Sequence, residues 1–152
     1  MPPIILIQSN VRLDRAVSRR AIAEAKSRGD PLIVLVVLDP AIPEKVASQF
    51  SDAGHVGLRP SQGFLSSLYQ RHERLALEQA QDIVADAKAE ELKVRSVVRR
   101  GDYATELARV IREERPQAVV VGKRRRSLLR FTTGDSFLGG LQREVGFALL
   151  EV

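Results

Sequence analysis

Residues 118–127 read AVVVGKRRRS and join an apolar strand, through a single glycine, to a run of basic residues. Four small or β-branched apolar residues in succession, with no polar residue between them, are typical of a strand covered on both faces. A helical pattern comes just before this strand, with Asp102 as the expected N-cap and apolar positions at Ala104, Leu107, Ala108 and Ile111. The stretch therefore predicts one helix-to-strand unit of a parallel sheet.

The same alternation extends over the rest of the chain. Short apolar runs predict further strands at residues 4–7, 32–38, 94–98 and 147–152. Apolar residues at helical spacing predict helices at residues 13–25, 65–87 and 136–144, the first of them ending before Gly29, a residue type that commonly ends helices. This succession predicts a three-layer α/β fold, an open sheet of five mostly parallel strands with helices on both faces.

Length and composition narrow the class of protein. The 152 residues are enough for one domain with its own core, and we predict that residues 1–152 form that domain. Cysteine is absent, which excludes disulfides, thiolate metal sites and cysteine nucleophiles and fits a reducing compartment. The apolar run at the N-terminus is too short to cross a membrane, so we expect a cytoplasmic protein with no membrane partner.

The segment from Gly101 to Ser127 resembles the second half of a universal stress protein. Residues 36–39, VVLD, are similar to the end of the second strand of that family, and the order and spacing of elements match over nearly the whole chain. The resemblance implies strands in the order 3-2-1-4-5 and a fold like that of the adenine nucleotide alpha-hydrolases. It also implies a homodimer through the last strand, from Phe147 to Val152, and, for one subgroup, ATP near the first and fourth strands.

The ATP-binding subgroup carries a glycine motif that this chain matches only in part. The motif is Gly, two residues, Gly, nine residues, and then Gly-Ser or Gly-Thr. Gly122 and Ser136 match it, Arg125 and Asp135 replace the second and third glycines, and Gly134 lies one position early. Glycine lets backbone amides approach a phosphate closely, whereas the side chain of Arg125 obstructs that approach and the carboxylate of Asp135 repels the phosphate.

Two further positions of the resemblance bear on a nucleotide. The acidic residue that the family carries after its first strand is Asn10 here, and the position beside the adenine is Val37. Together with Gly122, Gly134 and Ser136, they are the residues to which the resemblance assigns nucleotide contacts. With two glycines and the acid replaced, the sequence predicts ATP binding that is weak or absent, so ATP is an alternative ligand and no cofactor is assigned.

Arginines at the same strand end offer another way to hold an anion. Arg124, Arg125 and Arg126 begin two positions after Gly122. Guanidinium groups bind phosphate by charge and by paired hydrogen bonds, and they need no glycine to do so. A phosphate-containing small molecule is therefore the ligand class that these residues favour, and a solvated basic loop is the competing interpretation.

We interpret the chain as a regulatory or binding protein of the stress response, with no catalytic residue assigned. One alternative is a nucleotide-binding member of the same fold with slow hydrolase activity, although the chain contains neither a P-loop nor a Gly-x-Ser-x-Gly elbow. A second alternative is a basic α/β module that binds nucleic acid or polyphosphate, in keeping with the formal net charge of +5. The few aromatic residues are not interleaved with the basic runs, which disfavours single-stranded nucleic acid.

Overall fold

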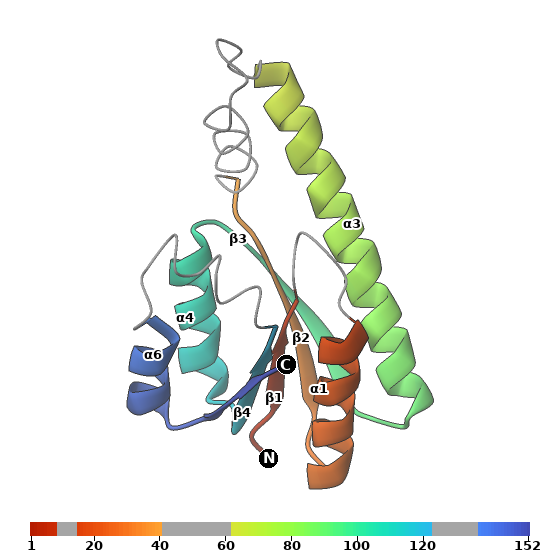
Figure 1. Cartoon of the computed structure of the whole chain (residues 1–152), viewed down its shortest axis with the longest axis vertical. Coiled ribbons are helices and arrows are strands. Elements are labelled where there is room, and N and C mark those ends of the chain that lie inside the picture. Colours follow the sequence, from red (N-terminus) through yellow and green to blue (C-terminus); the bar gives the residue numbers. More distant parts are fainter. Residues whose placement is uncertain (9–14, 41–61, 123–136) are drawn as a thin grey trace.

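A computed structural model of the protein describes residues 1–8, 15–40, 62–122 and 137–152 (Figure 1). Its elements follow in the order β1 (Ile4–Ile7), α1 (Arg15–Arg28), β2 (Leu32–Leu38), α3 (Gln62–Ala89), β3 (Val94–Arg100), α4 (Tyr103–Glu114), β4 (Ala118–Val121), α6 (Phe137–Val145) and β5 (Ala148–Glu151). The predicted strands and helices are confirmed in order and type, and their ends differ from the prediction by a few residues.

The five strands form one parallel sheet in the order β3-β2-β1-β4-β5, as the resemblance implied. Strand β1 lies at the centre and pairs with β2 on one side and with β4 on the other, so that Ile4 is opposite both Leu32 and Ala118. Strands β2 and β3 therefore extend the sheet on one side of β1, and β4 and β5 extend it on the other side. This reversal between β1 and β4 determines where a ligand can sit.

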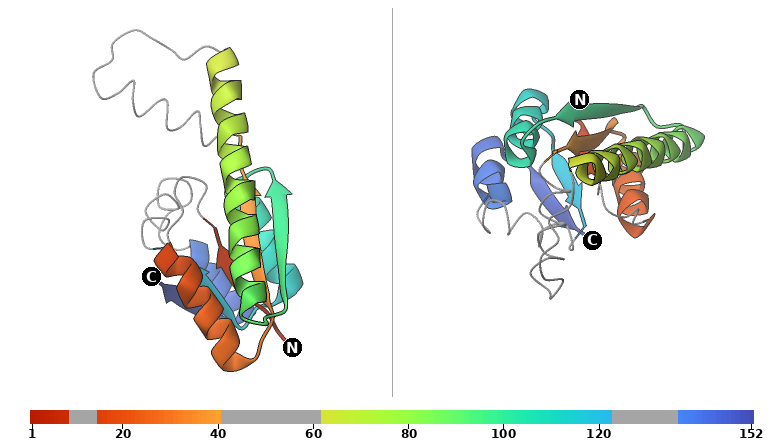
Figure 2. Two further views of the ribbon diagram at one scale, coloured as in Figure 1. Left: turned by 90° about the vertical axis from the view of Figure 1, so that its right-hand side faces the viewer. Right: turned by 90° about the horizontal axis from the view of Figure 1, so that it is seen from above.

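Helices cover both faces of the sheet. Helices α1 and α3 lie on one face, and α4 and α6 lie on the other, as the ribbon shows from three sides (Figures 1 and 2). Alternate residues of β1 point into the two layers: Ile5 and Ile7 pack with α4 and α6, whereas Ile4 and Leu6 pack with α1 and α3. Because the three central strands are buried on both faces, their sequences show no polar alternation.

Two predicted helix ends are confirmed in detail. Gly29 follows α1 with a φ of +68°, and the N–H of Asp30 donates to the carbonyl of Ala25 over 3.1 Å, which ends the helix as the sequence predicted. At the start of α4, Oδ2 of Asp102 accepts a hydrogen bond of 3.0 Å from the N–H of Thr105. Asp102 is therefore the N-cap that the pattern indicated.

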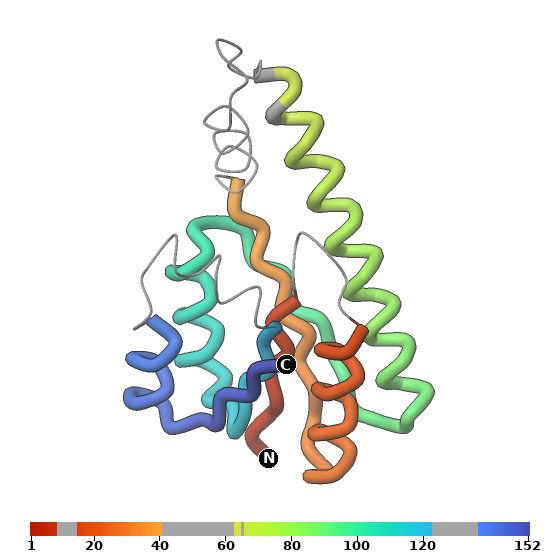
Figure 3. Tube along the Cα trace, in the orientation of Figure 1, coloured from red at the N-terminus to blue at the C-terminus, as the bar shows by residue number. Residues whose placement is uncertain are grey.

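Helix α3 is longer than the sheet that it covers. Its 28 residues span about 42 Å, and its N-terminal end projects past the carboxyl ends of the strands (Figures 1 and 3). The C-terminal half contributes Ala76, Ala80, Ile83 and Ala87 to the core. None of the described helices combines the length and apolarity that a membrane span requires.

Candidate functional site

The carboxyl ends of β1, β2 and β4 lie side by side at one edge of the sheet. Gln8 follows β1, Asp39 follows β2 and Gly122 follows β4. The N–H of Gln8 donates to the carbonyl of Leu35 over 2.9 Å, so the first of these strand ends is fixed against β2. In open parallel sheets the ligand crevice lies outside the carboxyl ends of the strands where strand order reverses, which here is the gap between β1 and β4.

Gln8 is a buried polar residue at this edge. Its side chain is 4% exposed, and Nε2 donates to the carbonyl of Ala76 over 2.9 Å and to Oε1 of Gln79 over 3.3 Å. A carbonyl can only accept, so this contact fixes which end of the Gln8 amide faces α3. Its own Oε1 has no hydrogen-bond partner within the described part of the chain. Gln8 thus attaches the end of β1 to the middle of α3.

Asp39 is the second buried polar residue of this edge, at 6% exposure. Its Oδ2 accepts a hydrogen bond of 3.0 Å from the N–H of Tyr103. The Asp102 cap lies at the same helix end, so two carboxylates accept amide N–H groups at the start of α4. They occupy the positive end of that helix dipole, which leaves little there to attract the phosphate of a ligand.

Gly122 and Val37 are the predicted contact residues that the structure describes. An added Cβ at Gly122 would lie 3.4 Å from Cγ2 of Val17, so β4 leaves the sheet in contact with α1. Val37, the residue before the last of β2, is fully buried and belongs to the core cluster that includes residues of α4 and α6. The other predicted contact residues lie outside the described residues: Asn10, Arg124, Arg125, Arg126, Gly134 and Ser136.

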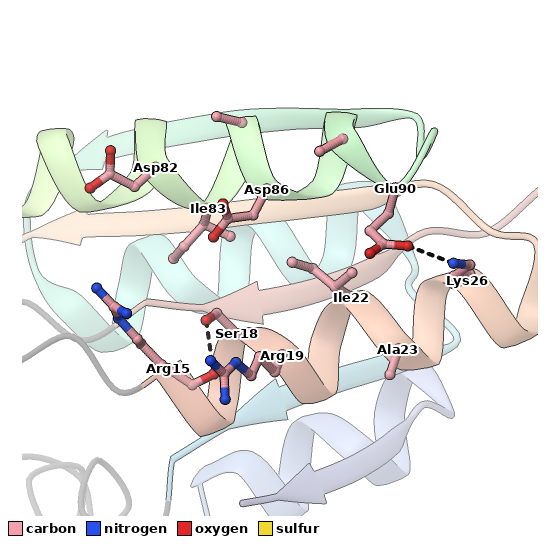
Figure 4. A pocket seen from close by; sticks show the side chains of 12 residues that line it. Arg15, Ser18, Arg19, Ile22, Ala23, Lys26, Asp82, Ile83, Asp86 and Glu90 are labelled. Atoms are coloured by element: carbon pink, nitrogen blue, oxygen red, sulfur yellow. Dashed lines mark hydrogen bonds and ion pairs between the residues drawn. The ribbon is translucent and has the colours of Figure 1, made fainter.

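A groove lies between α1 and α3, and no sequence pattern predicted it (Figure 4). Charged residues line both of its walls, and their helical spacing was visible in the sequence. What the sequence did not show is that these two helices lie next to each other, because that follows from the sheet order. Among the described residues, no group of three His, Asp or Glu side chains is placed to hold a metal ion.

Comparison with known proteins identifies similar sequences and folds. Residues 9–136 match the sequence model of the universal stress protein family. The fold is similar to that of a universal stress protein family member from Burkholderia pseudomallei, with a TM-score of 0.62 at 13% identity, covering 99% of this chain and 95% of that one. No curated protein sequence matches the chain.

Two similar structures were solved with a nucleotide. The universal stress protein from Archaeoglobus fulgidus in complex with dAMP has a TM-score of 0.57 at 17% identity, covering 99% of this chain and 97% of that one. A universal stress protein family member from Arabidopsis thaliana, with AMP bound, has a TM-score of 0.55 at 12% identity, covering 100% and 91%. At these identities the likeness is one of fold.

Proposed function

Because the chain belongs to the universal stress protein family, we propose that it is a cytoplasmic binding protein of the stress response with one domain over residues 1–152. Its ligand is a phosphate-containing small molecule held between the carboxyl ends of β1 and β4. The observation that carries this proposal is the reversal of strand order between these two strands, with Gln8 and Gly122 at their ends. The cysteine-free composition supports the cytoplasm as the compartment.

The class of ligand follows from what flanks that gap in the sequence. Asn10 comes two positions after Gln8, and Arg124 to Arg126 begin two positions after Gly122. The bound dAMP and AMP of the similar structures support a ligand with a phosphate and an adenine. In this chain the arginines supply the positive charge that a phosphate needs, because Arg125 and Asp135 replace two glycines of the family's motif.

We propose that ATP itself binds with a dissociation constant weaker than about 100 μM, equivalent to roughly −5.5 kcal/mol. Isothermal titration calorimetry with ATP, AMP and a short polyphosphate tests this directly. The variant with Arg124, Arg125 and Arg126 all replaced by Ser should lose binding of the anions. A matched variant, with Lys88, Lys93 and Arg143 replaced by Ser, loses the same charge at exposed positions by the amino ends of the strands and should keep the binding of the anions.

Two results would contradict the proposal. A low-micromolar constant for ATP would mean that the Gly134 register or the arginines restore a full nucleotide site. Equal losses of anion binding in the two triple variants would mean that the arginines act only through the net charge of the protein. Such long-range attraction is screened by salt beyond about 8 Å at physiological ionic strength.

The two edges of the sheet support a homodimer through β5. On the opposite edge strand, β3, Arg95 pairs with Glu114 over 2.7 Å, Arg99 pairs with Glu113 over 3.2 Å, and Arg100 pairs with Glu73. Charged side chains along an edge strand discourage pairing with another chain. Strand β5 carries one charged residue, Glu151, and its remaining residues are Ala and Leu. We therefore propose that two copies pair through β5 around a twofold axis.

A further inference from the structure

A groove runs between α1 and α3 on the outer surface of the molecule (Figure 4). Its volume is about 780 Å³. The lining begins at Arg15 and ends at Lys26 along α1, a length of about 16 Å at 1.5 Å per residue. The floor is apolar, since Ile22 and Ile83 lie at the bottom and pack onto the core beneath.

The two walls of the groove carry opposite charges. The α1 wall presents the basic residues Arg15, Arg19 and Lys26, and the α3 wall presents the acidic residues Asp82, Asp86 and Glu90. Residues four apart are neighbours on one side of a helix, so Arg15 and Arg19 are adjacent on α1, and Asp82, Asp86 and Glu90 follow one another along α3. The rows lie on the two helices that border the groove, and Arg15 and Asp86 are directed into the space between them (Figure 4).

The rows meet at one end only. Nζ of Lys26 lies 2.5 Å from Oε2 of Glu90, and this ion pair closes the groove near the C-terminal ends of both helices. Further along, Arg15 and Arg19 form no ion pair with Asp82, with Asp86 or with any other described residue. Four exposed charges thus stand on facing walls with open space between them.

We propose that this groove docks one helix of a protein partner, with an acidic row on the flank that faces α1 and a basic row on the flank that faces α3. The shape favours a helix because the trough is elongated and is bordered by two helix flanks. Ala23, Ala85 and Ala89 line it and let a third backbone come close. The docked helix completes the ion pairs that the walls leave open.

The charge pattern disfavours the other classes of occupant. A nucleic acid or an anionic membrane surface presents mainly negative charge, so it would meet repulsion from Asp82 and Asp86. A second copy of the same face would oppose one groove to another and would leave the apolar floor uncovered. Only an occupant with both signs of charge, in separate rows, satisfies both walls.

The test uses the full-length protein and a capped, alanine-based helical peptide of about five turns. Glu residues form a row on one flank of the peptide, Lys residues form a row on the other flank, and Leu residues lie between them. A control peptide has the same composition, but Glu and Lys alternate within each row. Fluorescence anisotropy should show the segregated peptide binding at least about tenfold more tightly than the control peptide, the sum of several exposed ion pairs.

Charge reversal in the protein separates docking from general attraction. Arg15→Glu with Arg19→Glu should weaken binding of the segregated peptide about tenfold, and Asp82→Lys with Asp86→Lys should do the same. Combining all four substitutions restores two oppositely charged walls with their signs exchanged. The peptide can then bind in the reverse direction, so affinity should return. Arg71→Glu with Arg74→Glu, on exposed positions of α3 outside the groove, is the matched control and should change little.

Several results would overturn the proposal. One is equal binding of the two peptides. Another is a variant with all four charge reversals that still binds the segregated peptide weakly, although circular dichroism shows that it is folded. No measurable binding of the segregated peptide would also count against it. Binding of a short polyphosphate that depends on Arg15 and Arg19, without peptide binding, would identify an anion site instead. The ATP titration probes the strand ends and uses none of these residues, so the two proposals fail separately.

Discussion

The carboxylate of Asp39 accepts a hydrogen bond of 3.0 Å from the backbone N–H of Tyr103, the first residue of α4. Asp39 follows β2, 64 positions earlier in the chain, so this contact joins the carboxyl edge of the sheet to the start of a helix. With Asp102 it fills the positive end of α4. This occupation of the helix end favours the gap between β1 and β4, away from α4, as the place of the proposed ligand.

We expect Asp39→Ala to lower the free energy of unfolding by about 1.5–3 kcal/mol, because it removes a buried hydrogen bond to a charged acceptor. Asp102→Ala is the matched control: it removes an exposed cap of the same helix and should cost about 1 kcal/mol. Urea denaturation at neutral pH measures both values. A smaller loss for Asp39→Ala than for Asp102→Ala would show that the buried contact adds nothing beyond an ordinary cap.

The contrast between Asp102 and Asp39 illustrates what the sequence could predict. The cap at Asp102 is a local signal, since donor and acceptor lie three residues apart. The partner of Asp39 depends on how β2 and α4 are placed in the fold, and no local pattern carries that information. The strands were predictable for a local reason too: burial on both faces leaves continuous apolar runs.

The candidate site was predictable to a smaller extent. Its position at the strand ends follows from the parallel topology, and the structure places Gln8 and Gly122 there. The interaction of Gln8 with Ala76 had no signal, because nothing in either segment indicates that α3 lies over the end of β1. The ligand contacts of the three arginines and of Asn10 stay a prediction, since these residues lie outside the described part of the chain.

Restoring the glycines tests why ATP binding is expected to be weak. In a variant with Arg125→Gly and Asp135→Gly, the motif of the ATP-binding subgroup is complete. We expect ATP affinity to rise about tenfold or more, since backbone amides can approach the phosphates and a repelling carboxylate is gone. Calorimetry compares this variant with Arg71→Gly, an exposed position on α3. Unchanged affinity in the double variant would show that the missing glycines are not what limits binding.

An ion pair between α4 and α6 predicts a pH effect. Nε of Arg112 lies 2.7 Å from Oε2 of Glu144, and this hydrogen bond lowers the pKa of Glu144 from its ordinary value. A carboxyl whose pKa is lower in the folded state stabilises the fold above its unfolded pKa. That contribution is lost as the pH falls through the lowered pKa.

The titration of Glu144 by NMR should therefore have its midpoint below the ordinary value of a glutamate side chain. Arg112→Gln removes the main cause and should return the midpoint towards the ordinary value. Salt at about 1 M, where the screening length is about 3 Å, should raise the midpoint of the unmodified protein in the same direction. A midpoint that does not respond to Arg112→Gln would contradict the role of this pair.

The outer edge of β5 allows a sharper test of the proposed homodimer than deletion of the strand, which would also remove part of the core. The N–H groups of Ala148 and Val152 donate to carbonyls of Gln117 and Val121 on the β4 side. Because N–H groups alternate between the two sides of a strand, those of Leu149 and Glu151 point to the open edge. Proline at position 151 removes one outward donor without breaking a bond to β4.

We expect Glu151→Pro to weaken dimerisation about tenfold or more, since the two copies lose two hydrogen bonds at their common edge. Ser96→Pro is the control: the N–H of Gly101 donates to β2, so by the same alternation the N–H of Ser96 faces the open edge of β3. It should leave the association unchanged. Sedimentation of both variants beside the unmodified protein at micromolar concentration measures this. A monomeric unmodified protein, or equal weakening by both prolines, would rule out pairing through β5.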